Sequence, residues 1–107
     1  MSSRLEHFRS LAARQPENPL FRFSLAQALE AEGQAEEALE HHRFCAAAKA
    51  DWMMPRILAG KILARLGRKA EAKTVLEEAL NLAVAQSHEE PKQELRALLA
   101  EIGCGGS

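Results

Sequence analysis

The sequence predicts an all-α protein of about six short helices, and three observations lead to that prediction. Residues that favour helices, above all Ala, Leu and Glu, are abundant, while Val, Ile and Thr are scarce. The chain has four Phe, one Trp and no Tyr, so its core must be built from Leu and Ala. Apolar residues recur at helical spacing, and Gly or Pro interrupts them at short intervals.

Proline and glycine mark the ends of the predicted helices. Pro16 ends the first helix, because a residue that precedes a proline avoids the α region. Asn18 and Pro19 start the second helix, as its N-cap and its first helical residue. Gly33 and Gly67 end the second and fourth helices.

Two polar residues mark the expected starts of the fourth and sixth helices. Asp51 is expected to cap the fourth helix, and Ser87 with Glu90 fits a capping box at the start of the sixth. The sixth helix is expected to end at Gly103. The expected helices therefore span about residues 3–14, 19–33, 35–49, 52–67, 69–85 and 88–103.

The chain contains an internal repeat. The stretches LEAEGQAEEA, from Leu29, and LARLGRKAEA, from Leu63, have Leu, Gly, Glu and Ala in the same places. Subtracting 33 from 67 for their glycines gives an interval of 34 residues. A single helix hairpin cannot bury its apolar face alone, so stacking of similar hairpins supplies the neighbour that each one needs.

Two helices per unit and a 34-residue interval resemble the tetratricopeptide repeat (TPR), whose pattern is W-x2-L-G-x2-Y, then A-x3-F, then P. The first helix matches the second half of a unit, through Phe8 and Pro16. Two full units follow, which keep the small residues and the turn glycines but lack the Trp, the Tyr and the final Pro. Their matched positions are Arg22, Leu25, Ala26, Leu29, Ala38, His42 and Ala50, then Arg56, Ala59, Gly60, Leu63, Ala72, Leu76 and Val84.

The resemblance implies the architecture of a small bacterial-type TPR protein. It predicts an antiparallel helix-hairpin solenoid with a half repeat, two full repeats and a C-terminal capping helix. The last helix fits as the first helix of a third unit if the chain is lengthened by two residues near Gln86 and Ser87. A single domain is expected over residues 1–103, followed by a flexible tail over residues 104–107.

The resemblance also implies a binding surface, because the first helix of each TPR unit lines a concave groove for an extended peptide or a partner's helix. Carried over by position, the expected groove residues are Leu20, Phe23, Gln27, Met54, Ile57, Leu58, Lys61, Arg65 and Gln93. The apolar end predicts a ligand with an apolar anchor, and Lys61 with Arg65 predicts a carboxylate or acidic patch on it. The alternative is that Phe23, Ile57 and Leu58 belong to the core between helices.

Catalysis and metal binding find little support in the sequence. His41, His42 and Cys45 are spaced to share a helix face, but a zinc site needs three or four ligands. The inward phase of the repeat explains His42 and Cys45 by packing alone. The chain has no local nucleophile motif and no Gly-rich phosphate loop, so we expect neither an enzyme nor a cofactor.

Charge and composition exclude several kinds of partner. A net charge of −1 provides no general attraction to nucleic acid. The sequence contains no apolar run typical of a signal peptide or a membrane span. Cys45 and Cys104 lie far apart, which is no disulfide framework. The expectation is a soluble cytoplasmic protein with reduced thiols and a protein or peptide partner.

Self-association is the alternative function. Residues 27–40 hold five Glu and no base, and residues 56–73 hold six Lys or Arg and one Glu. These blocks could pair, could join two molecules head to tail, or could simply be solvated. A homodimerising structural module without a peptide ligand would use Phe44 or an incomplete end of the repeat array. The sequence leaves open the identity of the partner and whether Phe44 and Trp52 are exposed.

Overall fold

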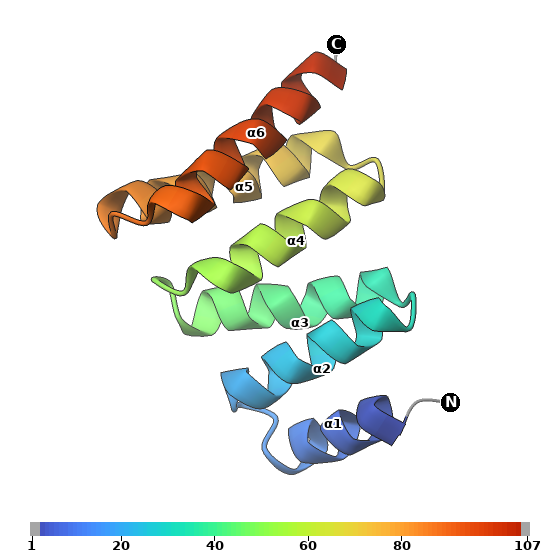
Figure 1. Cartoon of the computed structure of the whole chain (residues 1–107). Helices are drawn as coiled ribbons and strands as arrows, with labels where there is room; N and C mark the ends of the chain where they lie inside the picture. The colour runs from blue at the N-terminus through green and yellow to red at the C-terminus, as the bar shows by residue number, and fades with distance from the viewer. Residues whose placement is uncertain (1–2, 106–107) are drawn as a thin grey trace. The chain divides into compact units, whose positions relative to one another are not determined.

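The computed structural model describes residues 3–105, with side chains up to residue 103, and this part of the chain contains six α-helices and no strand (Figure 1). The helices are α1 (Ser3–Arg14), α2 (Pro19–Ala31), α3 (Ala35–Ala48), α4 (Met53–Arg65), α5 (Lys69–Ala85) and α6 (Glu89–Gly105). The all-α prediction is therefore confirmed, and all six helices lie within two residues of their expected bounds. The sixth continues past Gly103 to Gly105. The expected flexible tail over residues 104–107 is therefore wrong for Cys104 and Gly105, which belong to α6, and residues 106–107 lie outside the described part of the chain.

The chain forms two compact units, Met1–Pro55 (unit 1) and Arg56–Ser107 (unit 2). Unit 1 holds α1, α2, α3 and the first residues of α4, and in it α2 packs against α1 and α3. Unit 2 holds the rest of α4 together with α5 and α6, and in it α5 packs against α6. The expected single domain over residues 1–103 stays a prediction.

Unit 1 has the core that the repeat pattern predicts. Its helices cross through small residues, which allow close approach of the helix axes. One exposed ion pair, from Arg9 of α1 to Glu37 of α3, adds two hydrogen bonds of 2.8 and 3.0 Å. The buried side chains of α2 and α3 are Leu25, Ala26, Ala28, Leu29, Ala38, Leu39, His42 and Cys45.

Unit 2 uses a glycine at the place of closest contact between two of its helices. Gly60 of α4 faces Leu76 of α5, and a Cβ atom added at Gly60 would lie 2.5 Å from the Leu76 Cγ. Leu76 is fully buried, so its side chain has no free space to move into. The remaining buried residues of this unit's helices are Ile57, Ala59, Ile62, Leu63, Ala72, Ala79, Ala83 and Leu95.

The two turns that carry the repeat have the same geometry. Gly33 has φ of 80° and Gly67 has φ of 79°, in the left-handed region that glycine adopts without steric cost. In the first turn the backbone N–H of Gln34 donates to the Leu29 carbonyl at 2.9 Å, and in the second Arg68 donates to Leu63 at 2.9 Å. This pattern is the Schellman motif, and it confirms both glycines as helix ends.

The turn before α6 differs from its prediction. Ser87 has φ of 57°, and the N–H of His88 donates to the Ala83 carbonyl at 2.9 Å. Ser87 therefore occupies the position that Gly33 and Gly67 occupy after their helices, and it ends α5. The predicted capping box at Ser87 is wrong, since α6 begins at Glu89 and an N-cap residue needs an extended backbone.

Replacing Ser87 by glycine is expected to raise the free energy of unfolding by about 0.5–1 kcal/mol. A side chain in the left-handed region costs about 1–2 kcal/mol, and the greater freedom of glycine in the unfolded chain offsets part of that gain. Urea unfolding followed by circular dichroism measures the change. Ser10→Gly, at an exposed helical position of α1, is the matched control and should destabilise the chain. A lower midpoint for Ser87→Gly would contradict the assignment of this turn.

The start of α4 also lies one residue later than expected. The helix begins at Met53, which places Trp52 rather than Asp51 directly before it. Pro55 lies in the first turn as predicted, where its missing N–H has no partner to lose. None of the helices in the described residues is long and apolar enough to cross a membrane.

Candidate functional site

In unit 1 the expected binding residues of α2 lie on one helix face. Leu20, Phe23 and Gln27 follow each other at intervals of three and four residues, which places them in one row. Leu20 is 58% exposed, Gln27 is exposed, and Phe23 is half-buried. Met54, at the start of α4, is 44% exposed. These four residues are all accessible to a partner.

Aromatic contacts hold Phe23 in place. Its ring centroid lies 4.8 Å from that of Trp52 and 5.5 Å from that of His42, which it meets edge to face. Trp52 is half-buried, and the Lys49 ammonium lies 5.8 Å from its ring centroid. We call Leu20, Phe23 and Trp52 the aromatic surface of unit 1. The sequence left the exposure of Trp52 open. Its ring contact with Phe23 joins residues 29 positions apart, and no local pattern predicts such a contact.

His42 and Cys45 are buried behind this surface, as their inward phase predicted. Neither ring nitrogen of His42 has a hydrogen-bond partner, and its Nε2 lies 4.0 Å from Glu30 Oε1. Burial, with a smaller contribution from His41, lowers the pKa of His42 to about 4. The Cys45 thiol donates to the Pro19 carbonyl at 3.2 Å, and burial raises its pKa to about 11. Among the described residues no group of three His, Cys, Asp or Glu could hold a metal ion.

Arg22 connects the helices of unit 1 through three contacts that the sequence did not reveal. Its Nε donates to His41 Nδ1 at 2.9 Å, and its Nη1 donates to the Pro16 carbonyl at 2.9 Å. Its guanidinium lies 4.0 Å from the centroid of the Phe44 ring. Phe44 is consequently half-buried under a cation and does not offer a bare apolar patch for a second copy.

In unit 2 the structure corrects one of the expected binding residues. Ile57 is only 2% exposed, so its side chain belongs to the core and cannot line a binding surface. Leu58, one residue further along α4, is half-buried, and Arg65 and Gln93 are exposed. Ile57 falls on the same helical stripe as Gly60, which packs against α5.

Lys61 has a carboxylate partner within unit 2. Its Nζ lies 3.3 Å from Glu94 Oε2 of α6, and both side chains remain partly exposed. An acidic group of a ligand would share Lys61 with Glu94 or compete with it. The residues of the expected groove are thus divided between the two units, and the groove itself stays a prediction.

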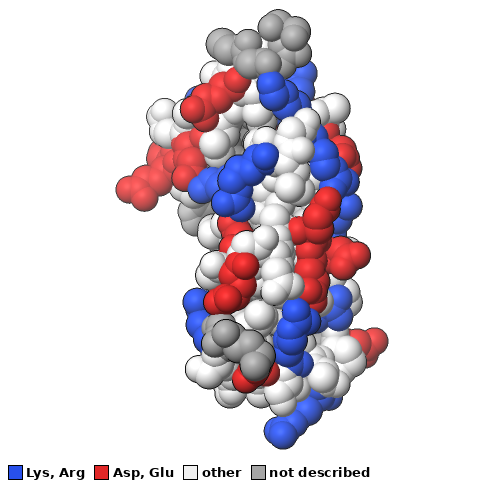
Figure 2. All heavy atoms as spheres, turned by 90° about the vertical axis from the view of Figure 1, so that its right-hand side faces the viewer, with Lys and Arg blue, Asp and Glu red and all other residues white. Residues whose placement is uncertain are grey.

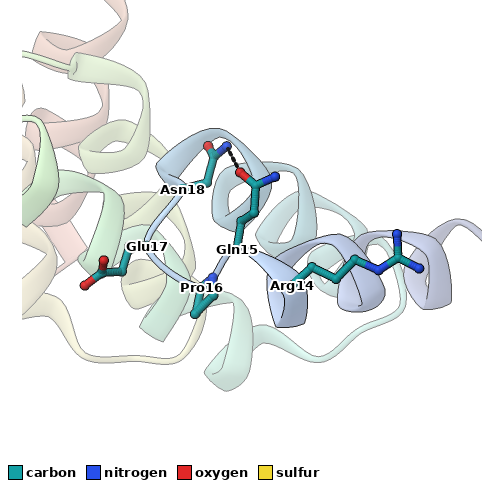
Figure 3. Close-up of a pocket in the computed structure, with 5 residues that line it drawn as sticks. All are labelled: Arg14, Gln15, Pro16, Glu17 and Asn18. Atoms are coloured by element: carbon teal, nitrogen blue, oxygen red, sulfur yellow. Dashed lines mark hydrogen bonds between the residues drawn. The ribbon is translucent and has the colours of Figure 1, made fainter.

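The turn between α1 and α2 forms a shallow hollow that lacks the chemistry of a site (Figure 3). Its walls are Arg14, Gln15, Pro16, Glu17 and Asn18. The Asn18 amide donates to Gln15 Oε1 at 3.1 Å, and its Oδ1 accepts from the Leu20 N–H as the predicted N-cap. In Figure 3 the Arg14 and Glu17 side chains point away from each other, so no charged groups converge here.

No family model matches the sequence, and no curated protein matches it. The structure is nevertheless similar to several solved structures. SycD, a type III secretion translocator chaperone of Yersinia enterocolitica, has a TM-score of 0.89 at 20% identity, over 95% of this chain and 71% of that one.

Two further structures contain bound partners. PcrH in complex with the chaperone binding region of PopD has a TM-score of 0.88 at 20% identity, over 96% of this chain and 78% of that one. The TPR2B domain of yeast Sti1, in its pHsp70 complex, has a TM-score of 0.84 at 15% identity, over 94% of this chain and 81% of that one. The chain therefore has a TPR-like fold, as its repeat predicts.

Proposed function

We propose that this chain is a non-catalytic protein-binding module that holds a peptide segment of a partner on the first helices of its repeats. The aromatic surface of unit 1 carries the proposal. Leu20 is a large apolar side chain left 58% exposed beside an aromatic pair, and such exposed apolar surface marks interaction sites. The similar PcrH and Sti1 structures, which contain protein partners, support the same class of function.

We infer that the bound segment has an apolar anchor for this surface. Phe23 is held by Trp52 and His42, so it loses little conformational freedom when a partner binds. A few residues contribute most of the affinity of a protein interface, and aromatic residues are enriched among them. An acidic element of the ligand would bind Lys61, beside Glu94 or in its place, together with Arg65. The cytoplasmic location expected from the sequence belongs to the same proposal.

Leu20→Glu is expected to weaken peptide binding at least about tenfold, because it places a charge where an apolar anchor packs. The probe is a set of short peptides selected on the native chain from a displayed random library. Their affinity is measured through the fluorescence of Trp52, the single tryptophan of the chain. Trp52 contacts Phe23 directly, so a ligand on this surface changes its emission.

Val84→Glu is the matched control, because Val84 is an equally exposed aliphatic residue on α5, at 54%. It should bind the selected peptides as the native chain does. The Lys61→Glu, Arg65→Glu double variant tests the acidic element and should lose only those peptides that carry an acid. Failure to select any peptide, or equal binding by Leu20→Glu, would contradict the proposed function.

A further inference from the structure

Arg22 of α2 lies at the centre of a set of contacts that joins three elements of unit 1. Its Nη1 donates to the Pro16 carbonyl in the α1–α2 turn, and its Nε donates to His41 Nδ1 on α3, both at 2.9 Å. Its guanidinium lies 4.0 Å from the centroid of the Phe44 ring, which is also on α3. Arg22 therefore covers Phe44 while it is bound to His41. We call Arg22, His41 and Phe44 the Arg22 cluster.

The hydrogen bond from Arg22 defines the protonation state of His41. A guanidinium can only donate, so Nδ1 of His41 must be the acceptor. In a neutral imidazole one nitrogen accepts and the other carries the proton, which places the proton of His41 on Nε2. That nitrogen lies 3.8 Å from Glu37 Oε2 on the same helix. The ring is thus neutral in the structure, with its acceptor bound to Arg22.

A proton added to His41 would remove this acceptor. Both nitrogens of an imidazolium are donors, so its Nδ1–H would face the Nε–H of Arg22, and neither group could accept from the other. Two positive charges would also lie in direct contact, which is unfavourable. Protonation of His41 and its hydrogen bond with Arg22 therefore exclude each other.

The charged groups around His41 act on it in opposite directions. Burial, and then Arg22 of α2, lowers the pKa of His41, while Glu37 and Glu40 of its own helix raise it in part. From α1, Arg9 binds Glu37 with hydrogen bonds of 2.8 and 3.0 Å, so His41 shares that carboxylate with a cation. The neutral ring is consequently the favoured form near pH 7, and a carboxylate is already in place for the charged form.

Mild acid acts on the Arg22 cluster through His41. Figure 2 shows Lys, Arg, Asp and Glu side chains over much of the face that it draws, and such side chains keep most of their charge between pH 7 and 5. Histidine is the side chain that ordinarily changes its charge in that range. The adjacent His42 is fully buried and has a pKa of about 4, so it stays neutral until the solution is more acidic.

We propose that His41 is a pH-sensitive switch in unit 1, which holds Arg22 over Phe44 when it is neutral and releases Arg22 when it is protonated. In the protonated state the imidazolium pairs with Glu37, and the Phe44 ring loses the cation that covers it. An aromatic ring of α3 then becomes more accessible in acid. The switch goes beyond peptide binding and involves no residue of the aromatic surface.

An NMR titration of the native chain tests the proposal. At pH 7 the ring nitrogen signals of His41 should show the proton on Nε2, and the Phe44 ring should shift the side-chain protons of Arg22 upfield. As the pH falls, Arg22 should lose most of that upfield shift, with the same midpoint as the titration of His41. The exposed Arg14 is the internal control and should show no such change. Phe44→Leu should abolish the upfield shift at pH 7, which identifies its origin.

Three variants distinguish a switch from a contact that is only structural. His41→Gln keeps an acceptor that does not titrate, so Arg22 should keep its upfield shift throughout the titration. Arg22→Gln removes the neighbouring cation and should raise the midpoint of the His41 titration. Arg14→Gln removes an exposed cation of the same unit and, as the matched control, should leave that midpoint unchanged. Circular dichroism at each pH verifies that the helices remain.

Any of five results would overturn the proposal. Two concern the native chain at its own pH response: a His41 proton on Nδ1 at pH 7, or an Arg22 shift that does not follow the titration of His41. Two concern the variants: an unchanged His41 midpoint in Arg22→Gln, or loss of the Arg22 shift in His41→Gln at the same pH as in the native chain. The fifth is loss of the helices before the Arg22 signals move, because the change would then be unfolding.

Discussion

Gly60→Ala is expected to lower the free energy of unfolding by up to about 2 kcal/mol, although alanine is the better helix former. The added Cβ would meet the Cγ and Cδ2 of Leu76, which is fully buried and cannot move away. Overpacking of this kind costs about 1–3 kcal/mol, and the higher helix propensity of alanine returns about 1 kcal/mol. Urea unfolding measures the difference.

Gly103→Ala provides the matched comparison. Gly103 also lies in a helix, but it is exposed and a Cβ there would meet nothing within 4 Å. Only the helix propensity then acts, so this variant should be equally stable or more stable. If Gly60→Ala also stabilised the chain, α4 and α5 could not be packed as closely as the structure shows.

Lowering the pH from 7 to 5 should reduce the free energy of unfolding by about 2 kcal/mol through His42. Burial, and then His41, lowers its pKa from the ordinary 6.5 to about 4 in the folded chain. Between pH 6.5 and 4 the His42 ring therefore binds a proton in the unfolded state but stays neutral in the folded state. The stabilisation is complete above pH 6.5, falls between 6.5 and 4, and amounts to about 3 kcal/mol in all.

Urea unfolding at pH 7 and at pH 5 measures this loss, and an NMR titration of the His42 ring gives its pKa directly. His42→Phe removes the ionisable ring and should show a smaller decrease between the two pH values. The neighbouring His41 contributes in the same direction, because burial and Arg22 lower its pKa as well. An unchanged decrease in His42→Phe would contradict the burial of a neutral imidazole.

Periodicity and turn chemistry predicted most of the fold. Gly33 and Gly67 sit where the apolar periodicity stops, and each adopts the left-handed backbone for which glycine is suited. Asn18 and Pro19 mark the start of α2 through the local physics of a helix N-terminus. Such signals act within a few residues, so a single sequence contains them in full.

Ser87 shows where local signals become ambiguous. Serine followed three residues later by glutamate satisfies a capping box, yet the same serine ends the preceding helix with φ of 57°. The structure has the second arrangement, in which the hydrogen bond from the His88 N–H to the Ala83 carbonyl closes the end of α5. The hydrogen bonds that end α5 take precedence here over a capping box at the start of α6.

The candidate surface was harder to predict than the fold for a related reason. Placing Ile57 in a groove assumed that it lies on the accessible side of α4. Neighbouring residues of a helix point in directions about 100° apart, so a small error in the expected helix orientation places a core residue on the surface. The partners of Lys61 and Arg22 come from other helices, 33 and 19 residues away. No short-range pattern reports such pairings, whereas the exposure of Leu20 follows from the periodicity of α2 alone.

The rate at which the Cys45 thiol is modified provides a measure of local opening in unit 1. The sulfur is fully buried, donates to the Pro19 carbonyl, and has a pKa raised to about 11. Thiol reagents attack the thiolate, so at neutral pH the closed unit protects this sulfur both by burial and by protonation. The rate at which a reagent modifies Cys45 is therefore set by how often the helices around Pro19 separate. It reports the opening of unit 1 under conditions in which the chain as a whole remains folded.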